Sequence, residues 1–578
     1  MFVAILSGMK NSANNGSTWV ITTIAIAVCV YAFYTHAIWA LCSNTDAGWL
    51  IQTGEHILTH GLPKTNMYSW AIPGHPLVAY QWLFEIIAAL FFRFGSLWFV
   101  GLSACLVVAA LIFYVLPRIW MDKGVPAFLP FAALAIVQSP SWFHARPQLV
   151  SYCLILAFLC LLERYRTTGN VRWLLPLPPL VVLWANTHLL WTFGLFTVFI
   201  YLACDAWRRK AWPFALSICF AACAAAVLVN PYGAGLIGYA ASLASFLGGS
   251  QFLQIWEMQP SFISSEGCIY FFGVLIGSIV LLLARRKLTA EALILSLTVT
   301  LSALFIRRFQ PVAIMTMWTF VGDAIVALGW LKASAQAPPT SSLAMSRTAR
   351  ATWFKIGQAA LVLCVPVISW YSHVPNITTA WMVFTEDALP LLAAYQKVRT
   401  ADDHLFNEDT MGSWLIGMQA APVFFDTRFD NYPKSFVESA VNCLRAEGNW
   451  SQCLDAWQIT QVLVRDTTPL NQALMYRPDW TLVLHDGKFA WWQRKTELSD
   501  AILRHWSLSD DLVSDSKMPE WIIKNTIESR AAKHLLLARI YRGKHQTGAA
   551  IEQAETGLKL LPQSSALQKE LALCGESM

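Results

Sequence analysis

Asp46 is the carboxylate of this sequence that is best placed to act as a base. It directly follows the first long apolar run and precedes Gly48, so it lies where an apolar segment gives way to a polar loop. A carboxylate there could accept the proton of an attacking hydroxyl group. The alternative is structural, because aspartate often caps a helix N-terminus and a helix is expected to begin near Gly48. Both interpretations are compatible with the sequence.

Three arginines could bind an anion such as a phosphate group. Arg146 lies in a short polar segment between apolar runs, and Arg307 and Arg308 lie together in another. The planar guanidinium group matches the geometry of phosphate oxygens. Each arginine could instead form an ion pair with a carboxylate, and Asp46 and Glu257 are available.

Three other polar residues are candidates for substrate contact. His188 could donate a hydrogen bond to a phosphate, or it could satisfy a buried turn. Glu85 and Glu257 could contact a substrate, or they could hold the loops in which they occur. We assign no metal ligand, and the sequence neither requires nor excludes a divalent cation as cofactor.

The composition predicts that a membrane domain positions these residues. The chain is 56% hydrophobic and 13% charged, against about 25% charged residues in a typical soluble domain. Long apolar runs fill the chain from Thr18 to Tyr371, whereas the charge density from Thr400 onward is that of a soluble domain. We therefore expect an all-α polytopic membrane domain with about 11 transmembrane helices, followed by a soluble region.

Basic residues between the apolar segments predict the topology. Lys and Arg beside membrane helices favour the cytoplasmic side, and clusters of them occur at intervals from Lys10 to Lys355. Nine predicted spans are Trp19–Cys42, Ser96–Leu116, Val125–Ser139, Leu149–Leu162, Ala211–Val229, Ile269–Ala284, Leu288–Ile306, Val312–Leu331 and Phe354–Tyr371. This arrangement puts the candidate residues and the region after Tyr371 outside the cytoplasm.

The segment between Arg172 and Arg208 contains two more predicted helices. Its 35 residues are too few for two full spans of about 20 residues each, so we expect two short helices that meet at a turn. The polar residues in the middle of the segment, Trp184–His188, mark that turn.

Several short motifs resemble those of the GT-C-type glycosyltransferases, which are polytopic enzymes that take a sugar from a polyprenyl-phosphate carrier. The resemblance is to the bacterial branch and covers most of residues 19–372. The motifs, in chain order, are Asp46-Ala47-Gly48-Trp49, Gly54–Pro63, Tyr80–Glu85, Arg146-Pro147-Gln148, Trp184–His188 and Asn230–Gly233.

The resemblance implies that Asp46 corresponds to the catalytic aspartate of the family. Two features of the sequence depart from the family pattern. Tyr80-Gln81 stands where a His-Glu pair is common, and Asp46 stands alone where many members have two adjacent carboxylates. The second departure leaves a requirement for a metal ion open.

The C-terminal region is expected to contain an α/β domain and a helical tail. Predicted strands are Leu405–Asn407, Val423–Asp426, Gln461–Arg465, Thr481–Leu484 and Phe489–Gln493, and predicted helices are Met411–Met418, Lys434–Glu447 and Ser451–Gln458. Apolar residues from Leu535 to Pro562 match one tetratricopeptide-like helix pair. The predicted domains are 1–372 (transmembrane), 373–498 (extracytoplasmic α/β) and 499–578 (helical).

Two local features of this region carry predictions of their own. Asp426-Thr427-Arg428 could face the active site, but we interpret it as a surface salt bridge. Cys443 and Cys453 are expected to form a disulfide, since such bonds persist outside the cytoplasm.

These features predict a glycosyltransferase of the bacterial inner membrane that acts on its outer face. Its partners would be membrane lipids, a polyprenyl-phosphate-linked sugar and an acceptor lipid, glycan or protein, with a protein contact through the C-terminal helices and no nucleic acid. One alternative is a polysaccharide polymerase or ligase that uses a lipid diphosphate donor. Another is a transporter or scaffold for envelope polymers, although the deep ionisable residues and internal repeats of transporters are absent from the sequence.

Overall fold

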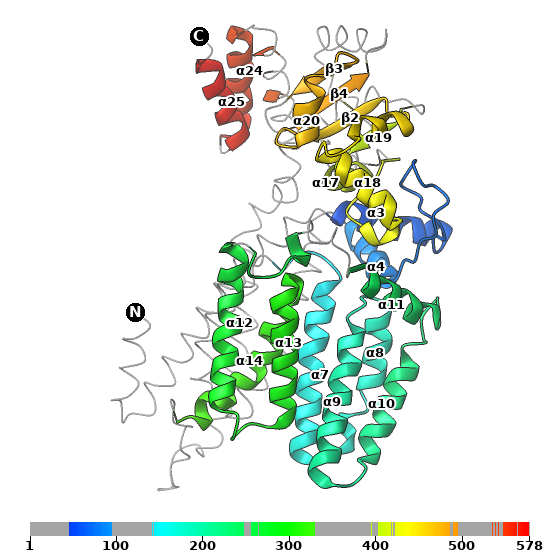
Figure 1. Cartoon of the computed structure of the whole chain (residues 1–578), viewed down its shortest axis with the longest axis vertical. Helices are drawn as coiled ribbons and strands as arrows, with labels where there is room; N and C mark the ends of the chain where they lie inside the picture. The colour runs from blue at the N-terminus through cyan, green and yellow to red at the C-terminus, as the bar shows by residue number, and fades with distance from the viewer. Residues whose placement is uncertain are drawn as a thin grey trace. The chain divides into compact units, whose positions relative to one another are not determined.

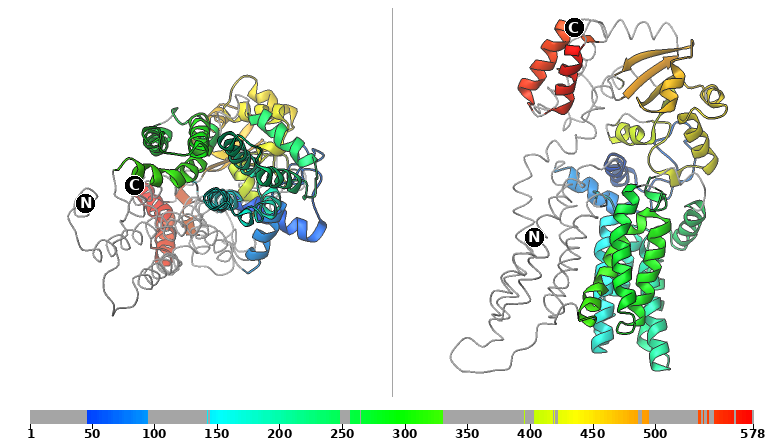
Figure 2. Two further views of the ribbon diagram at one scale, coloured as in Figure 1. Left: turned by 90° about the horizontal axis from the view of Figure 1, so that it is seen from below. Right: turned by 60° about the vertical axis from the view of Figure 1, so that its left-hand side comes forward.

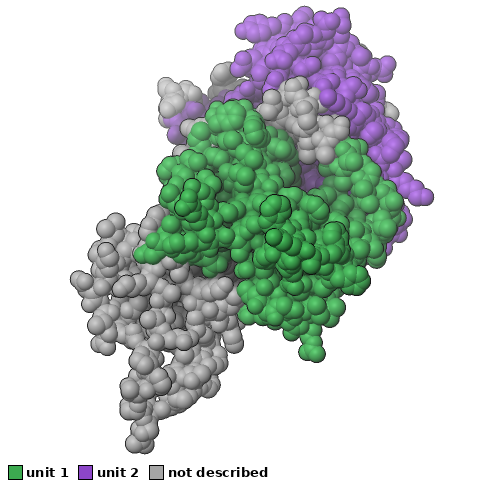
Figure 3. Space-filling view, turned by 60° about the horizontal axis from the view of Figure 1, so that its bottom comes forward, with its two compact units in different colours: residues 1–42, 100–376 green, residues 43–99, 377–578 purple. Residues whose placement is uncertain are grey.

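The fold is described from a computed structural model of the chain. Contacts between Cα atoms divide the chain into two compact units (Figure 3): unit 1 is Met1–Cys42 with Val100–Asn376, and unit 2 is Ser43–Phe99 with Ile377–Met578. The structure describes residues 46–94, 142, 144–247, 256–263, 265–329, 395, 403–417, 419, 422–485, 489–494, 534–535, 538, 541–542, 547–562 and 564–576.

The described part of unit 1 is helical. Six helices lie side by side with their axes roughly parallel or antiparallel (Figures 1 and 2), namely α7, α8, α9, α10, α12 and α13. The helices are α7 (Gln148–Thr168), α8 (Leu177–Ala185), α9 (Trp191–Arg209), α10 (Phe214–Ala226), α11 (Gly235–Leu247), α12 (Ser265–Leu283), α13 (Ala290–Phe305) and α14 (Gln310–Ala327), with 3-10 turns η2 (Val171–Trp173), η4 (Trp256–Met258) and η5 (Arg307–Phe309).

Local sequence signals explain where these helices begin and end. Gly169 ends α7 in the left-handed conformation (φ 69°), which glycine adopts without strain. Thr289 caps α13, since its hydroxyl accepts a hydrogen bond from the backbone of Ala292. The predicted turn after Arg172 is present, since α8 ends at Ala185 and α9 begins at Trp191. The prediction that both helices are short holds for α8, which has 9 residues, and is wrong for α9, which has 19.

The prediction of about 11 transmembrane helices is wrong. Within the residues that the structure describes, one helix, Gln148–Thr168, is long and apolar enough to cross a membrane, and much of it is buried in the protein. A span needs about 20 residues, but α10 has 13 and α13 has 16. The apolar runs extend past the ends of these helices, so counting runs overestimated the spans. Four predicted spans, Trp19–Cys42, Ser96–Leu116, Val125–Ser139 and Phe354–Tyr371, lie outside the described residues.

Unit 2 combines a segment from the N-terminal part of the chain with a small mixed sheet. The segment carries α3 (Ala47–His60) and α4 (Trp82–Phe92). The sheet has the strand order β1-β2-β4-β3, with β1 and β2 parallel and the other two pairs antiparallel. Its elements are β1 (Leu405–Asn407), α17 (Asp409–Gly417), η6 (Phe429–Asn431), α18 (Lys434–Leu444), α19 (Trp450–Ala456), β2 (Gln461–Arg465), α20 (Pro469–Leu474), β3 (Trp480–His485) and β4 (Phe489–Arg494).

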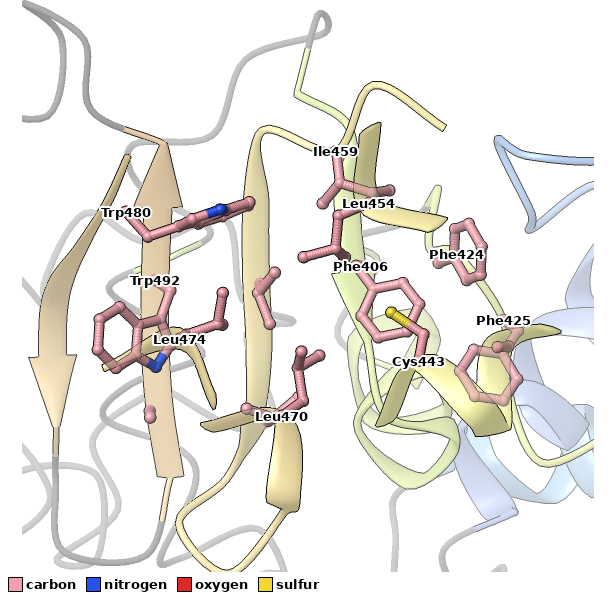
Figure 4. Packing of buried hydrophobic residues seen from close by; sticks show 14 of the residues in the cluster. Phe406, Phe424, Phe425, Cys443, Leu454, Ile459, Leu470, Leu474, Trp480 and Trp492 are labelled. Carbon is pink, nitrogen blue, oxygen red and sulfur yellow. The ribbon is translucent and has the colours of Figure 1, made fainter. Parts of the chain in front are cut away.

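Aromatic and aliphatic side chains fill the space between this sheet and its helices (Figure 4). Strand β2 runs in the middle of the sheet and is buried from Gln461 to Val464. Helix α18 presents Phe436, Val437, Ala440 and Cys443 to the core, at the spacing of one helix face. Four of the five predicted strands and all three predicted helices of this region are present in the structure.

Two predictions for this region are wrong. Val423–Asp426 is not a strand of the sheet, because the backbone of Val423 pairs with residues 68–70 of the N-terminal segment instead. Cys443 and Cys453 are free thiols in the structure. The thiol of Cys443 lies in the core, where it donates to the carbonyl oxygen of Trp450.

The tail of unit 2 contains helices α24 (Thr547–Leu560) and α25 (Ser565–Glu576), which pack against each other. Arg542 donates to the buried carboxylate of Glu570 across this part. Helices are present where the sequence predicted them, and the tetratricopeptide-like interpretation stays a prediction.

Candidate functional site

Asp46 immediately precedes α3, but its side chain does not cap that helix. Its backbone is already helical (φ −85°, ψ −12°), and its carboxylate makes no capping hydrogen bond. Instead, Oδ1 of Asp46 accepts a hydrogen bond of 2.7 Å from the hydroxyl of Thr427. The capping interpretation is therefore wrong, and the carboxylate contacts a residue 381 positions later in the chain.

Thr427 is held by two buried side chains. Nε1 of Trp49 donates to Oγ1 of Thr427 over 3.1 Å, and the hydroxyl of Ser413 lies 2.8 Å from the same oxygen. The backbone N–H of Thr427 donates to Oγ of Ser413 over 3.3 Å. Trp49 and Ser413 are buried, whereas Thr427 and Asp46 are half-buried. The carboxylate is thus oriented by packed neighbours while its own surface is partly exposed.

Glycines allow the two helices around this group to approach closely. A Cβ atom on Gly48 would lie 2.5 Å from the carbonyl oxygen of Ser413 and 2.9 Å from Cα of Gly417. Both contacts are with backbone atoms, which cannot move aside as a flexible side chain can. Helix α17 therefore lies directly against the first turn of α3, which begins after Asp46.

Asp426 and Arg428 form a buried ion pair beside Thr427. Nε and Nη2 of Arg428 donate to the two carboxylate oxygens of Asp426 over 2.9 and 2.7 Å. Tyr432 donates to the same carboxylate over 2.7 Å. Burial alone would raise the pKa of Asp426, but the adjacent guanidinium and these hydrogen bonds lower it below its ordinary value. The prediction of a surface salt bridge is wrong, because both residues are buried.

The guanidinium of Arg428 also contacts two aromatic rings of the N-terminal segment. Its Cζ lies 5.1 Å from the ring centre of Trp49 and 4.8 Å from that of Tyr68. Cation–π contacts of this kind strengthen when they are shielded from water. The Asp426-Thr427-Arg428 segment therefore joins the sheet region to the residues that surround Asp46.

Glu85 is buried on α4, near the same guanidinium. Burial raises the pKa of Glu85 to about 8, against opposing effects from Arg428 and a hydrogen bond with Gln81. Among the described residues, none forms a hydrogen bond with its Oε2 atom. At neutral pH this carboxyl group is mostly protonated, so it would meet a polar partner as a hydrogen-bond donor.

Asp409 is a second carboxylate near Asp46 that the sequence analysis missed. It is half-buried at the start of α17. Burial and the charges of Glu408 and Asp46 raise the pKa of Asp409 to about 6. The predicted helix began at Met411, so Asp409 was outside the element that brings it close to α3.

Unit 1 holds a group of charged residues around Glu257. Nη1 of Arg146 donates to Oε1 of Glu257 over 3.0 Å, and Nε of Arg308 lies 3.7 Å from Oε2. One carboxylate is thus shared by two guanidinium groups. We call Arg146, Arg308 and Glu257 the arginine cluster, and its three charges sum to +1.

His188 is buried close to this cluster. Its Nδ1 lies 2.8 Å from the hydroxyl of Ser151, which also accepts a hydrogen bond of 2.7 Å from the indole of Trp184. Burial and the positive charge of Arg308 both lower the pKa of the His188 imidazole. Arg307 is fully buried, and its backbone N–H donates to the carbonyl oxygen of Gln259. The structure thus brings Arg146, His188, Arg308 and Glu257 together.

The candidate residues therefore fall into two groups, one in each unit. Asp46 and Glu85 belong to unit 2, and the other five belong to unit 1. Across the described ranges, no three His, Cys, Asp or Glu side chains come together in a way that could hold a metal ion. His56 and His60, one turn apart on α3, have stacked rings 4.8 Å apart but belong to no such group of three.

No family model matches the chain, and neither does any curated protein sequence. Inferences about function therefore start from the residues and contacts described above.

Proposed function

We propose that the chain is a membrane-bound glycosyltransferase of the GT-C type, which transfers a sugar from a polyprenyl-phosphate carrier to an acceptor hydroxyl. The observation that carries the proposal is the hydrogen bond from Thr427 to Asp46. This hydrogen bond holds the carboxylate of Asp46, which makes no capping hydrogen bond to α3. A half-buried carboxylate held in this way is suited to accept a proton from an acceptor.

Two groups of residues have distinct tasks in the proposed reaction. Asp46 accepts the proton of the acceptor hydroxyl as its oxygen bonds to the anomeric carbon of the sugar. The bond between that carbon and the phosphate oxygen breaks, and its electron pair leaves with the polyprenyl phosphate. In unit 1, Arg146 and Arg308 have the charge and the planar donors that bind a phosphate group. The meeting of two guanidinium groups at Glu257 supports this assignment, because guanidinium groups match the geometry of phosphate oxygens.

The surface of unit 1 supports a location at a membrane, where a polyprenyl carrier is found. Apolar side chains are exposed along three helices, including Phe214 on α10 (72% exposed), Phe272 on α12 (58%) and Leu297 on α13 (57%). Trp207 and Trp212 are exposed on either side of the basic residues 208–210. Tryptophan and basic residues in such proximity are typical of the membrane–water interface. We propose the bacterial inner membrane, with the reaction on its outer face.

The test is a transfer assay with the full-length protein. Polyprenyl-phosphate-linked radiolabelled glucose, mannose and galactose serve as donor probes, and a bacterial membrane extract supplies acceptors. Asp46→Asn keeps the shape of the side chain but removes the base, so we expect turnover to fall by about 10²- to 10⁴-fold. Glu55→Gln removes a half-buried carboxylate of α3 that pairs with Arg93 rather than with Thr427, and it should change turnover little.

An Asp46→Asn protein with near wild-type turnover would contradict the proposed base. If the arginines were then still required, the result would favour a polymerase or ligase that uses a lipid diphosphate donor. Wild-type protein that releases no labelled sugar from any of these donors would count against the proposed donor class.

A further inference from the structure

We propose that Thr427 is a positioning residue for the base, so that the C-terminal region completes the active site. The inference builds on the proposed function and adds a specific task for a residue far from Asp46 in the sequence. Thr427 contacts the carboxylate of Asp46 directly, through a hydrogen bond of 2.7 Å. Its hydroxyl holds one oxygen atom of that carboxylate.

The chemistry of the neighbouring groups determines the direction of this hydrogen bond. An indole N–H and a backbone N–H can only donate. The N–H of Trp49 therefore donates to Oγ1 of Thr427, and the N–H of Thr427 donates to Oγ of Ser413. Ser413 can then donate its own hydroxyl hydrogen to Oγ1 of Thr427. With both lone pairs of Oγ1 occupied, the single hydroxyl hydrogen of Thr427 points to Asp46.

The surrounding packing keeps Thr427 from moving away. On one side its neighbour Arg428 lies against the rings of Trp49 and Tyr68 and is paired with Asp426. On the other side the helix that carries Ser413 is in backbone contact with Gly48. Asp46 itself is half-buried and lies before the first turn of α3, and the hydroxyl of Thr427 holds its Oδ1 atom.

A group that orients a base affects the rate of reaction more than substrate binding. Misplacing a reacting group by about 1 Å can lower the rate by about 10²-fold. Loss of the Thr427 hydroxyl should therefore lower kcat by about 10- to 100-fold, while the KM for the donor changes little. A residue that only stabilised the fold would lower the amount of active protein but leave these parameters unchanged.

The experiment compares Thr427→Val with Thr427→Ser in the full-length protein. Valine has nearly the shape of threonine but no hydroxyl, whereas serine keeps the hydroxyl. We expect kcat to fall in Thr427→Val and to be mostly restored in Thr427→Ser. Thr53→Val is the matched control, because it removes a buried hydroxyl from α3 that bonds to Tyr68 rather than to Asp46. It should leave kcat unchanged.

A double substitution distinguishes a role through Asp46 from a separate effect. If Thr427 acts through the carboxylate, Thr427→Val should cause little further loss in the Asp46→Asn background. Equal losses in both backgrounds, or a Thr427→Val protein with wild-type kcat beside an inactive Asp46→Asn protein, would overturn the inference and leave the proposed function intact. A fully active Asp46→Asn protein would overturn both. Should Thr427→Val fail to accumulate, Thr427→Ala also removes the hydroxyl and leaves no methyl group in its place.

Discussion

Charged residues are arranged differently in the two units. In unit 2, Asp426 and Arg428 pair one to one, and Tyr432 adds a hydrogen bond to the same carboxylate. In unit 1, Arg146 and Arg308 share the single carboxylate of Glu257. The first arrangement is balanced and buried, which suits a structural support. The second has a surplus of positive charge, which suits an anionic ligand.

This difference assigns different energetic roles to arginines that look alike in the sequence. In a buried pair of opposite charges, loss of one partner leaves the other as an uncompensated charge. Such a pair therefore supports the fold only as a unit. A cluster with surplus charge and partial exposure can exchange part of its pairing for a phosphate oxygen. Arg308, whose side chain is 37% exposed, belongs to the second kind. Arg428, whose side chain is 5% exposed, belongs to the first.

The largest expected effect comes from breaking the pair in unit 2. Arg428→Met would leave the carboxylate of Asp426 buried without its partner, at a cost of about 3–5 kcal/mol in the free energy of unfolding. Thermal unfolding of the full-length protein measures the change. The control is Arg93→Ala, which breaks a bidentate but exposed pair with Glu55. Such pairs contribute about 0–1 kcal/mol. Equal shifts in the two variants would contradict the assigned structural role.

The buried pair also illustrates what the sequence could and could not predict. Local patterns predicted β1, β2 and α18, because short apolar runs and helical spacing are properties of neighbouring residues. No pattern among the residues next to Asp426-Thr427-Arg428 indicates which side chains this segment contacts. The groups that bury it, Trp49 and Tyr68, lie more than 350 residues earlier in the chain. A single sequence contains no local signal for a contact of that kind.

The same limit applies to the candidate site and to the membrane prediction. Asp46 was identifiable because it follows an apolar run, and Arg146 and Arg308 because the predicted topology puts them outside the cytoplasm, where arginine beside a membrane helix is unusual. Asp409 was missed because its proximity to Asp46 depends on the packing of α17 against α3. The number of spans was overestimated because an apolar run does not reveal where its helix ends.

The second prediction concerns Glu85 and the pH dependence of stability. The unfolded protein loses this proton near pH 4.5, whereas the folded protein keeps it until about pH 8. Between these values the unfolded state binds fewer protons, so wild-type stability falls as the pH rises. Glu85→Gln removes this dependence. Its advantage in the free energy of unfolding should therefore grow with pH in this window, by at most about 1.4 kcal/mol for each pH unit.

Unfolding midpoints measured between pH 4.5 and 9 would test this expectation. The advantage of Glu85→Gln should level off above about pH 8, where both states of the wild type have lost the proton. A difference between Glu85→Gln and the wild type that stays constant with pH would mean that burial does not control this carboxyl group.

The third prediction concerns the contact of α3 with α17. Gly48→Ala would place a Cβ atom 2.5 Å from the carbonyl oxygen of Ser413, so one helix must shift. We expect a loss of about 1–3 kcal/mol in stability, together with lower transfer activity because Asp46 moves with α3. Gly74→Ala is the control, since no atom lies within 4 Å of the Cβ position there. If Gly48→Ala behaved like this control, the close packing would not be needed to orient the base.

The smallest expected effect tests the arginine cluster of unit 1. Arg308→Ala removes one of two guanidinium groups and with it the surplus positive charge, which leaves Arg146 and Glu257 as a neutral pair. A lost charge-assisted hydrogen bond contributes about 1.5 kcal/mol, so donor KM should rise about tenfold. Arg285→Ala, which removes an exposed charge from the end of α12, controls for the change in net charge.

Donor titrations of both variants at two salt concentrations measure the effect. Since the wild-type cluster attracts the phosphate by its charge, added salt should weaken donor binding more in the wild type than in Arg308→Ala. A rise in KM of the same size in both arginine variants would mean that only the overall charge matters, and the cluster would then be structural like the pair in unit 2.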